Sequence, residues 1–365
     1  MARLGDVCKK GSSNITQKDL EGHSGNYPIF GASGFITNVD FYQQEKPYIA
    51  VIKDGAGIGR IMKLPEKSSI IGTMQYIIPN DTVDISYLAY EMEHMDLAKY
   101  FTGATIPHIY FKDYQKEELP LPILDEQRKI AAVLDKVSDL IAKRRQQLDK
   151  LDEMVKARFV EMFGDPETNT KNWRVFPMSK ICSVGSSKRI YQSEQSFSGV
   201  PFWRISDLTN LITTGTVAPD LYIPEERYEA LKSQGQVPAP GDILITSRGT
   251  LGQCYIVKEN DKFYFQDGMI SWLSGYMDSV IPLYISYLFA MPGFRKQIDY
   301  MQAGSTVVYL SITMIKKLKV MLPDIESQQQ FASFVTQTDK SKLAIQKSLE
   351  KLETLKKALM QEYFG

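Results

Sequence analysis

Thr102-Gly103-Ala104-Thr105-Ile106 returns later in the chain as Ala303-Gly304-Ser305-Thr306-Val307, a stretch of the same pattern. A Leu-Pro pair follows each stretch, and a long charged segment then ends in Phe-Gly, at Leu121-Pro122 and Phe163-Gly164 and again at Leu322-Pro323 and Phe364-Gly365. All three landmarks are offset by 201 residues. This period is far longer than that of a solenoid, so it indicates a duplicated unit of one domain and one helix. The pseudo-twofold symmetry that results suits a partner with two equivalent halves, such as duplex DNA.

The charged segments predict two long helices. Residues 125–163 contain no Gly or Pro, and apolar residues recur at steps of four and three, at Ile130, Leu134, Val137, Ile141, Leu148, Leu151, Val155 and Met162. A second seam follows at Phe331, Val335, Ile345, Leu349, Leu352, Leu359 and Tyr363. Arg144 and Arg158 interrupt the first seam, and Thr338, Lys342 and Lys356 interrupt the second. We expect the helices to pack antiparallel, through Ile130, Leu134, Leu148, Leu151, Val335, Leu349 and Leu352.

The rest of the chain predicts two β-rich domains. Short β-branched and aromatic runs between Gly and Pro predict strands at residues 48–52, 69–71 and 76–78, followed by a helix over 85–101. The expected fold class is therefore α+β, with two β-rich globular domains separated by the two coiled-coil-type helices. The expected boundaries are 1–124 for the first domain, 125–163 for the central helix, 164–324 for the second domain and 325–365 for the last helix.

Composition excludes several classes of protein. The 43 Lys and Arg balance 43 Asp and Glu, which argues against a non-specific nucleic-acid coat but allows a local basic patch. The three cysteines form no CxxC pair, and the three histidines show no ligand spacing, so no metal or other cofactor is expected. Without an apolar run of about 18 residues or a signal-peptide pattern, the chain is expected to be cytoplasmic and not bound to a membrane.

The duplicated motifs resemble those of the specificity subunits of type I restriction-modification enzymes. The resemblance rests on Gly103 to His108, on Leu119-Pro120-Leu121-Pro122-Ile123 and on Glu126-Gln127-Arg128-Lys129-Ile130, and it extends over essentially the whole chain. The second half keeps Leu322-Pro323 and Gln328, but it has Val308-Tyr309 in place of Pro107-His108 and Ser327 in place of Glu126.

The resemblance implies a subunit that recognises a DNA sequence and performs no chemistry itself. Each recognition domain would read one half of a bipartite, asymmetric target in double-stranded DNA. The helices would set the gap between the halves and bind two methyltransferase subunits, to which restriction and translocase subunits can add.

Two basic segments are candidates for DNA contact. The glycine-rich residues 54–60 lie between two predicted strands, which favours a tight hairpin over a phosphate-binding loop because such a loop must open a helix. Arginine can form paired hydrogen bonds with guanine, whereas lysine mainly contacts phosphate. The predicted contacts are Lys53, Arg60 and Lys63 in the first domain and Lys188, Arg189, Trp203, Arg204 and Arg248 in the second. The alternative for each is ordinary solvated surface. The Gly103 to His108 and Gly304 to Tyr309 loops are predicted as structural turns, with DNA contact as the alternative.

Two rival functions are considered. A methyltransferase would need a catalytic Asn-Pro-Pro-Tyr-type loop, which the sequence lacks, so a non-catalytic subunit is expected. A coiled-coil adaptor that never reads DNA is the other alternative. The helices and loops repeat well, whereas residues 13–41 and 187–236 diverge, and this divergence favours two readers of different half-sites.

Overall fold

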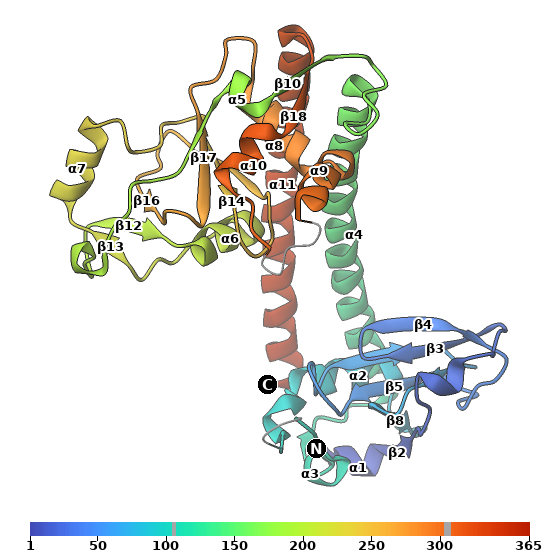
Figure 1. Cartoon of the computed structure of the whole chain (residues 1–365). Coiled ribbons are helices and arrows are strands. Elements are labelled where there is room, and N and C mark those ends of the chain that lie inside the picture. Colours follow the sequence, from blue (N-terminus) through green and yellow to red (C-terminus); the bar gives the residue numbers. More distant parts are fainter. Residues whose placement is uncertain (104–106, 303–307) are drawn as a thin grey trace. The chain divides into compact units, whose positions relative to one another are not determined.

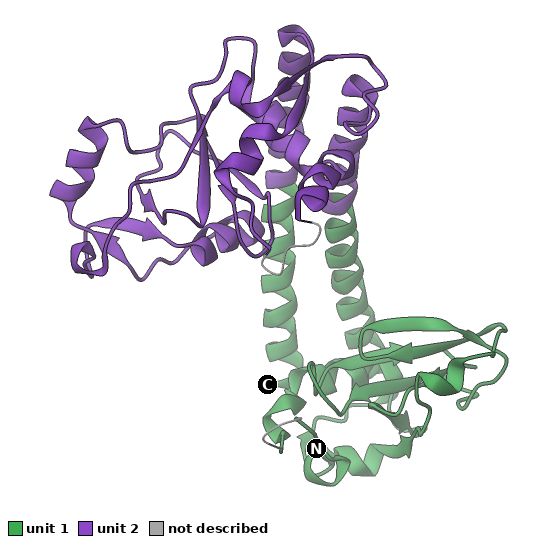
Figure 2. Cartoon of the chain, viewed as in Figure 1, with its two compact units in different colours: residues 1–147, 344–365 green, residues 148–343 purple. Residues whose placement is uncertain are grey.

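The computed structural model describes residues 1–103, 107–302 and 308–365, which divide into two compact units. Unit 1 comprises residues 1–147 and 344–365, and unit 2 comprises residues 148–343 (Figure 2). Each unit combines one globular domain with parts of two long helices, α4 (Leu124–Phe163) and α11 (Ile325–Phe364) (Figure 1). The α+β class and the internal repeat expected from the sequence are confirmed.

Unit 1 contains three small sheets. The central sheet has the order β2-β8-β5-β6, with all neighbours antiparallel, and it is formed by β2 (Cys8–Ser12), β8 (Met74–Pro79), β5 (Tyr48–Ile52) and β6 (Ile61–Leu64). A second sheet has the order β4-β3-β7, formed by β4 (Gly34–Val39), β3 (Tyr27–Gly31) and β7 (Ser69–Ile70). The terminal strands β1 (Ala2–Arg3) and β9 (Glu118–Leu119) form the third.

Unit 2 repeats this plan strand for strand. Its central sheet is β11-β17-β14-β15, formed by β11 (Ser183–Gly185), β17 (Ile270–Ser274), β14 (Ile243–Thr246) and β15 (Cys254–Ile256). The second sheet is β13-β12-β16, formed by β13 (Tyr222–Ile223), β12 (Val200–Trp203) and β16 (Tyr264–Phe265). The third pairs β10 (Arg174–Pro177) with β18 (Lys319–Leu322).

Short helices cover the sheets and mark the differences between the units. Unit 1 has α1 (Leu4–Val7), α2 (Ile85–His94) and α3 (Phe111–Tyr114), with 3-10 turns η1 (Lys18–Leu20) and η2 (Leu97–Tyr100). Unit 2 has α5 (Met178–Ile181), η3 (Gln192–Glu194), α8 (Pro282–Ala290), α9 (Pro292–Gln302) and α10 (Ile312–Lys317). It also has α6 (Ile205–Thr214) and α7 (Glu225–Ser233), which lie in the segment where the two halves of the sequence diverge.

The predicted strands and helices agree with the structure in most places. The strands expected at 48–52, 69–71 and 76–78 correspond to β5, β7 and β8. The helix expected over 85–101 is wrong in its second half, because Asp96 has a left-handed backbone with φ of 47° and separates α2 from η2. The long helix α4 ends at Phe163, and Gly164 follows with φ of 80°, which is the helix-ending geometry predicted for this glycine.

The two long helices run antiparallel within each unit. In unit 1, the N-terminal half of α4 packs against the C-terminal end of α11, where Leu134 and Met360 are buried together with Tyr90 of α2, and Ile130 packs against them. In unit 2, Phe159 of α4 packs edge-on against Phe331 of α11, with ring centroids 5.4 Å apart, beside a buried Val335. Leu148, Leu151, Leu349 and Leu352 are only half-buried, so the predicted seam is tightest at its two ends.

The polar residues that interrupt the seam have partners. In unit 1, Arg144 donates to the Ser348 hydroxyl at 3.2 Å, and Lys356 pairs with Glu93 of α2 at 2.8 Å. In unit 2, Lys342 pairs with Asp152 across the helices. These contacts hold the helices in register, because each residue finds its partner only at one relative position along the pair.

A buried glutamine anchors the start of each long helix. Gln127 accepts from the backbone N–H of Asp84 at 2.8 Å and donates to the carbonyls of Pro122 at 2.8 Å and Thr82 at 3.2 Å. Gln328 accepts from the N–H of Ile281 at 2.9 Å and donates to the carbonyls of Pro323 and Ser279, at 2.9 and 3.0 Å. The duplicated Leu-Pro and Gln motifs of the sequence therefore form one structural joint in each unit.

Candidate nucleic-acid interface

One β-hairpin has the same backbone frame in both units. In unit 1, β5 and β6 are joined by residues 53–60, and in unit 2, β14 and β15 are joined by residues 247–253. Ile52 donates its backbone N–H to the Arg60 carbonyl at 3.1 Å and accepts from the N–H of Gly59 at 2.8 Å. Thr246 makes the same two bonds, to the Gln253 carbonyl at 3.0 Å and from the N–H of Gly252 at 2.9 Å. This pairing makes Ile52 equivalent to Thr246 and Arg60 equivalent to Gln253. The hairpin predicted at residues 54–60 is confirmed.

The next residue along the chain continues the equivalence. Lys53 donates its N–H to the Thr73 carbonyl and accepts from the N–H of Ile109, at 3.1 and 3.0 Å. Ser247 makes the matching bonds to Met269 and Leu310, at 2.9 and 3.0 Å. It follows that Lys53 matches Ser247, that Asp54 matches Arg248 and that His108 matches Tyr309. By this register Arg248 corresponds to Asp54 and not to Arg60.

Glycines allow the hairpin of unit 1 to turn. Gly55, Gly57 and Gly59 have φ values of 81°, 98° and 79°, a backbone conformation that side chains with a Cβ rarely adopt. A Cβ on Gly59 would also lie 2.6 Å from the backbone nitrogen of Ala98. The glycine pattern is accounted for by turn geometry and close packing, as the hairpin interpretation requires.

A basic pocket lies beside the hairpin in unit 1. Its volume is about 430 Å³, and it is lined by Lys10, Ser12, Ser13, Asn14, Lys53, Gly72, Gln75, His108, Ile109 and Tyr110. The Asp54 carboxylate contacts both the Lys53 ammonium and the His108 imidazole. The pocket offers cationic, hydroxyl and amide groups together, which is the mixture that phosphate and sugar contacts use.

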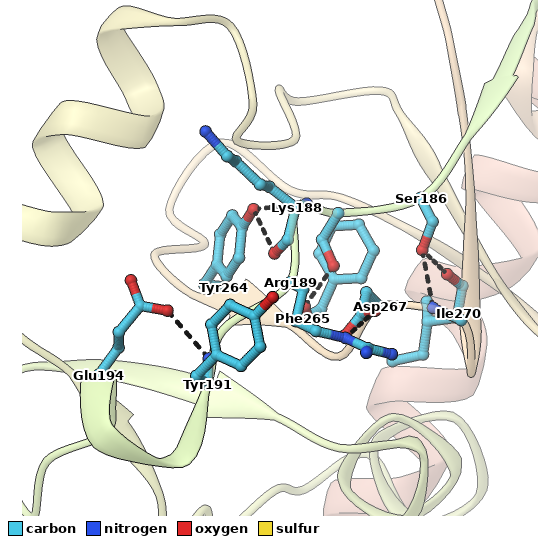
Figure 3. A network of polar contacts seen from close by, with 11 residues as sticks. Ser186, Lys188, Arg189, Tyr191, Glu194, Tyr264, Phe265, Asp267 and Ile270 are labelled. Atoms are coloured by element: carbon cyan, nitrogen blue, oxygen red, sulfur yellow. Dashed lines mark hydrogen bonds and ion pairs between the residues drawn. The ribbon is translucent and has the colours of Figure 1, made fainter.

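In unit 2, the loop after β11 repeats the Ser12-Ser13 pair of this pocket as Ser186-Ser187, and it carries Lys188 and Arg189. A polar network holds this loop in place (Figure 3). Ser186 donates to the Ile270 carbonyl at 2.7 Å and accepts from the N–H of Gly268 at 3.2 Å. The Tyr264 hydroxyl bonds to both backbone groups of Lys188, at 2.9 and 3.2 Å, while the exposed lysine side chain points away from the network (Figure 3). Because Ser247 bonds to Met269, the segment 268–270 brings this loop and the hairpin together.

Arg248 and Arg189 differ in their surroundings. The Arg189 guanidinium pairs with the Asp267 carboxylate at 3.0 Å. The Arg248 side chain is exposed, and its guanidinium carbon lies 5.3 Å from the centre of the Tyr309 ring. Within the part of the chain that the structure describes, no carboxylate lies within ion-pair distance of Arg248.

Arg60 and Lys63, which the sequence placed in one patch, point to different neighbours. Arg60 is exposed but donates to the carbonyls of Gly57 and Ala32, at 3.3 and 3.0 Å, and so ties the hairpin to the end of β3. Lys63 donates to the Ser86 hydroxyl of α2 at 2.7 Å and lies 3.7 Å from the Asp135 carboxylate of α4. Only Lys53 of the three lines the basic pocket.

Two residues of unit 2 that were predicted to contact DNA interact with other side chains of the protein. Trp203 is 6% exposed and stacks on Phe263 with ring centroids 3.6 Å apart, so it is a core residue and not a base contact. Arg204 directly precedes α6 and bonds to the carboxylates of Asp207 and Asp220, at 3.4 and 2.5 Å. The Arg204 guanidinium is therefore already paired within the protein, and the side chain remains 38% exposed.

Part of the site was not predicted from the sequence. Lys10, Ser12 and Asn14 line the pocket, and the only signal for them was the repeated Gly-Ser-Ser of residues 11–13 and 185–187. The predicted Gly103 to His108 and Gly304 to Tyr309 loops include residues 104–106 and 303–307, which lie outside the described residues. His108 and Tyr309, at the ends of these loops, both contact the hairpin.

Two other kinds of site are absent from the described residues. They contain no group of three or more His, Cys, Asp or Glu that could hold a metal ion. Their helices include none with the length and apolar character needed to span a membrane.

Comparison with known proteins identifies the family. The family model of the type I restriction modification DNA specificity domain matches residues 1–152 and 170–357. The chain belongs to this family. Its role is therefore that of a DNA sequence-recognition subunit, which is non-catalytic, and the alternative of an adaptor without sequence readout is wrong.

Individual relatives agree over nearly the full length. The chain is 25% identical over 392 residues to the specificity subunit of the type I restriction enzyme MjaVIII of Methanocaldococcus jannaschii, covering 99% of this chain and 90% of the relative. It is 24% identical to the MjaIX specificity subunit of the same organism, covering 78% of this chain and 69% of that subunit.

The fold has solved counterparts. The type I restriction-modification S subunit from M. genitalium superposes with a TM-score of 0.62 at 15% identity, covering 100% of this chain and 95% of the counterpart. A chain from a structure concerned with the assembly and conformational transition of the type I R-M system gives a TM-score of 0.54 at 16% identity, covering 99% of this chain and 96% of that chain.

Proposed function

We propose that this specificity subunit reads a bipartite DNA target with two unlike half-sites, one bound by each unit. The observation that carries the proposal is the shared hairpin frame with different side chains. Lys53, Asp54 and His108 in unit 1 occupy the backbone positions of Ser247, Arg248 and Tyr309 in unit 2. A common frame places both sets against DNA in the same way, and the difference in donors and acceptors makes the bases read unlike.

Within each interface, some residues contact phosphate and position the DNA, and others contact base edges and read the sequence. Lys10, Lys53 and Lys188 supply ammonium groups that suit phosphate, while the hairpin ends, His108 and Tyr309 face the groove. Neutralising phosphates releases counterions and gives affinity independent of sequence. The chain as a whole has no net charge, so this affinity depends on where these cations lie and not on the total.

The number of partner subunits is inferred from the two repeats, and the place where they dock is inferred from the long helices. The proposed complex holds two methyltransferase subunits, one for each repeat, and restriction and translocase subunits join them. Apolar side chains that remain exposed on α4 and α11 support docking at these helices: Val133, Leu140, Met154, Val160, Leu343 and Leu355. Scattered exposed apolar residues are common, but several on one pair of helices are typical of a surface that binds protein.

The helices also set the gap between the half-sites in this proposal. Each contains 40 residues and is about 60 Å long at 1.5 Å per residue. One turn of B-DNA is about 34–36 Å, so a helix of this length can hold two readers more than a turn apart.

Base-modification sequencing tests the proposal directly. The chain is expressed with its cognate methyltransferase in cells that lack other DNA methylation, and the methylated motif is determined with and without the chain. A split motif with two unlike halves and a fixed gap, lost when the chain is omitted, is the expected result. A continuous motif, or methylation that does not depend on the chain, would contradict the proposal.

A further inference from the structure

One arginine at the hairpin of unit 2 has the features of a base reader. Arg248 is the first residue after the hydrogen-bonded entry of the hairpin, and its equivalent in unit 1 is Asp54. A change from carboxylate to guanidinium at one backbone position exchanges acceptors for donors. Such an exchange alters which base edge can be bound there.

Among the residues that the structure describes, the guanidinium of Arg248 has no hydrogen-bond or ion-pair partner. Arg189 and Arg204, the other arginines predicted for unit 2, pair with Asp267 and with Asp207 and Asp220. Arg248 has no such partner among the described residues, and it is exposed. Its guanidinium carbon lies 5.3 Å from the centre of the Tyr309 ring, a cation–π contact that uses none of the guanidinium N–H donors.

Both members of the Arg248 and Tyr309 pair are fixed in place by the backbone. The Gln302 side chain donates to the Tyr309 carbonyl at 2.8 Å and accepts from its N–H at 3.0 Å. On the hairpin, the Thr246 hydroxyl accepts from the N–H of Gln253 at 3.0 Å, and Gly249 turns with φ of 68°. A backbone that is already ordered loses less conformational freedom on binding, so the arrangement favours readout over loose phosphate contact.

The equivalent position in unit 1 cannot act in this way. Asp54 is held between Lys53 and His108, and Arg60, the arginine of that hairpin, donates to two backbone carbonyls. The hairpin of unit 1 therefore has at this place a carboxylate paired with an ammonium and an imidazole, and its own arginine is bonded to the backbone.

We propose that Arg248 recognises a guanine in the half-site bound by unit 2, through paired hydrogen bonds to N7 and O6, and that Tyr309 positions it. The inference rests on the proposed function and adds the class of base to it. Paired Arg–guanine bonds discriminate against other bases roughly ten- to hundredfold. The half-site bound by unit 1 has no arginine-read guanine at the corresponding place.

The test determines the methylated motif of variants in the assembled complex with the methyltransferase. Arg248→Lys keeps the charge but removes the planar fork, and Arg248→Gln favours adenine instead of guanine. We expect both to lose selectivity at one guanine of one half-site, with methylation there slowed roughly ten- to hundredfold, while the other half-site and the gap stay unchanged. Arg174→Gln is the matched control, because Arg174 is also exposed and lies 5.2 Å from the ring centre of Phe176 on β10.

The outcomes separate the inference from the proposed function. A wild-type chain that yields no split motif overturns the proposed function. A split wild-type motif that both Arg248 variants leave unchanged overturns only the guanine assignment, as does an equal effect of Arg174→Gln. Tyr309→Phe should preserve the guanine preference and Tyr309→Ala should weaken it, since the ring positions the guanidinium without reading a base.

Discussion

Glu91 is a carboxyl group held in the core of unit 1. It lies on α2 with 2% of its surface exposed, and within the described residues its Oε2 has no hydrogen-bond partner. Burial, reinforced by the Glu117 carboxylate, raises the pKa of Glu91 from 4.5 to about 8. The folded protein therefore keeps this proton at pH values where the unfolded chain has lost it.

The first prediction concerns the pH dependence of stability. The pKa of Glu91 is higher in the folded protein than in the unfolded chain, so its neutral carboxyl group contributes to the free energy of unfolding. This contribution is fully present below about pH 4.5 and is lost as the pH rises through about 8. The loss should be about 2–4 kcal/mol between pH 5 and 8. Urea denaturation over this range should show the slope in the wild type and a much flatter profile in Glu91→Gln. Glu93→Gln, on the same helix but exposed, should keep the wild-type slope, and an unchanged slope in Glu91→Gln would show that Glu91 does not titrate in this way.

The second prediction concerns Lys188 as a phosphate contact. Its backbone is fixed by Tyr264 while its ammonium is exposed, so Lys188→Ala removes a charge without disturbing the network of Figure 3. DNA binding should weaken equally for all sequences, and the slope of log K against log salt should fall by about 1. Fluorescence anisotropy at several salt concentrations measures both quantities. A change in the methylated motif would show instead that Lys188 reads a base.

At the scale of whole elements, the joints between domain and helix depend on two glutamines. Gln127 and Gln328 each satisfy three backbone groups at the start of a long helix, and both are completely buried. A local sequence motif cannot show this, because two of the three partners of each glutamine lie more than 40 residues away, in the loops before α2 and α8.

The third prediction is that Gln328→Ala destabilises unit 2. The change leaves the N–H of Ile281 and the carbonyls of Ser279 and Pro323 without this partner, which costs about 1–3 kcal/mol for a buried group. The free energy of unfolding, measured with urea, should fall by this amount. The neighbouring Gln329 is exposed, so Gln329→Ala should change it little. Equal effects of the two variants would contradict the proposed joint.

At the scale of the whole molecule, the helix pair has a fixed register. In unit 1, Arg145 pairs with Glu353 at 2.7 Å, and in unit 2, Lys342 pairs with Asp152. An insertion in one helix alone makes these two registers incompatible, so a test of the spacer must lengthen both helices together.

The fourth prediction follows from this register. Duplicating residues 141–147 in α4 and residues 344–350 in α11 adds seven residues, or about 10 Å, to each helix. The gap in the methylated motif should grow by about three base pairs at 3.4 Å per step, with both half-sites unchanged. Duplication in α4 alone should reduce methylation. A double insertion that methylates with the original gap would show that the helices do not set the spacing.

Local pattern accounts for most of what the sequence could predict. The period of apolar residues and the absence of Gly and Pro define α4, and Gly164 ends it, because helix formation depends on neighbouring residues. Sequence alone also established the duplication and the α+β class, and its resemblance to specificity subunits agrees with the family assignment. It treated exposed and buried aromatic residues alike, however, and so placed the core residue Trp203 among the DNA contacts.

Equivalence between the two interfaces was decided only by the tertiary structure. The segments between motifs differ in length in the two halves, so the residue offset between equivalent positions changes along the chain. Cys8 matches Cys182 and Lys53 matches Ser247, whereas the Leu-Pro and Phe-Gly motifs are offset by 201 residues. Hydrogen bonds from distant strands fix which residue reaches each end of the hairpin, and no local pattern contains that information. Those bonds place Arg248 opposite Tyr309 and Asp54 opposite His108, because strand pairing has to close the same sheet in both units.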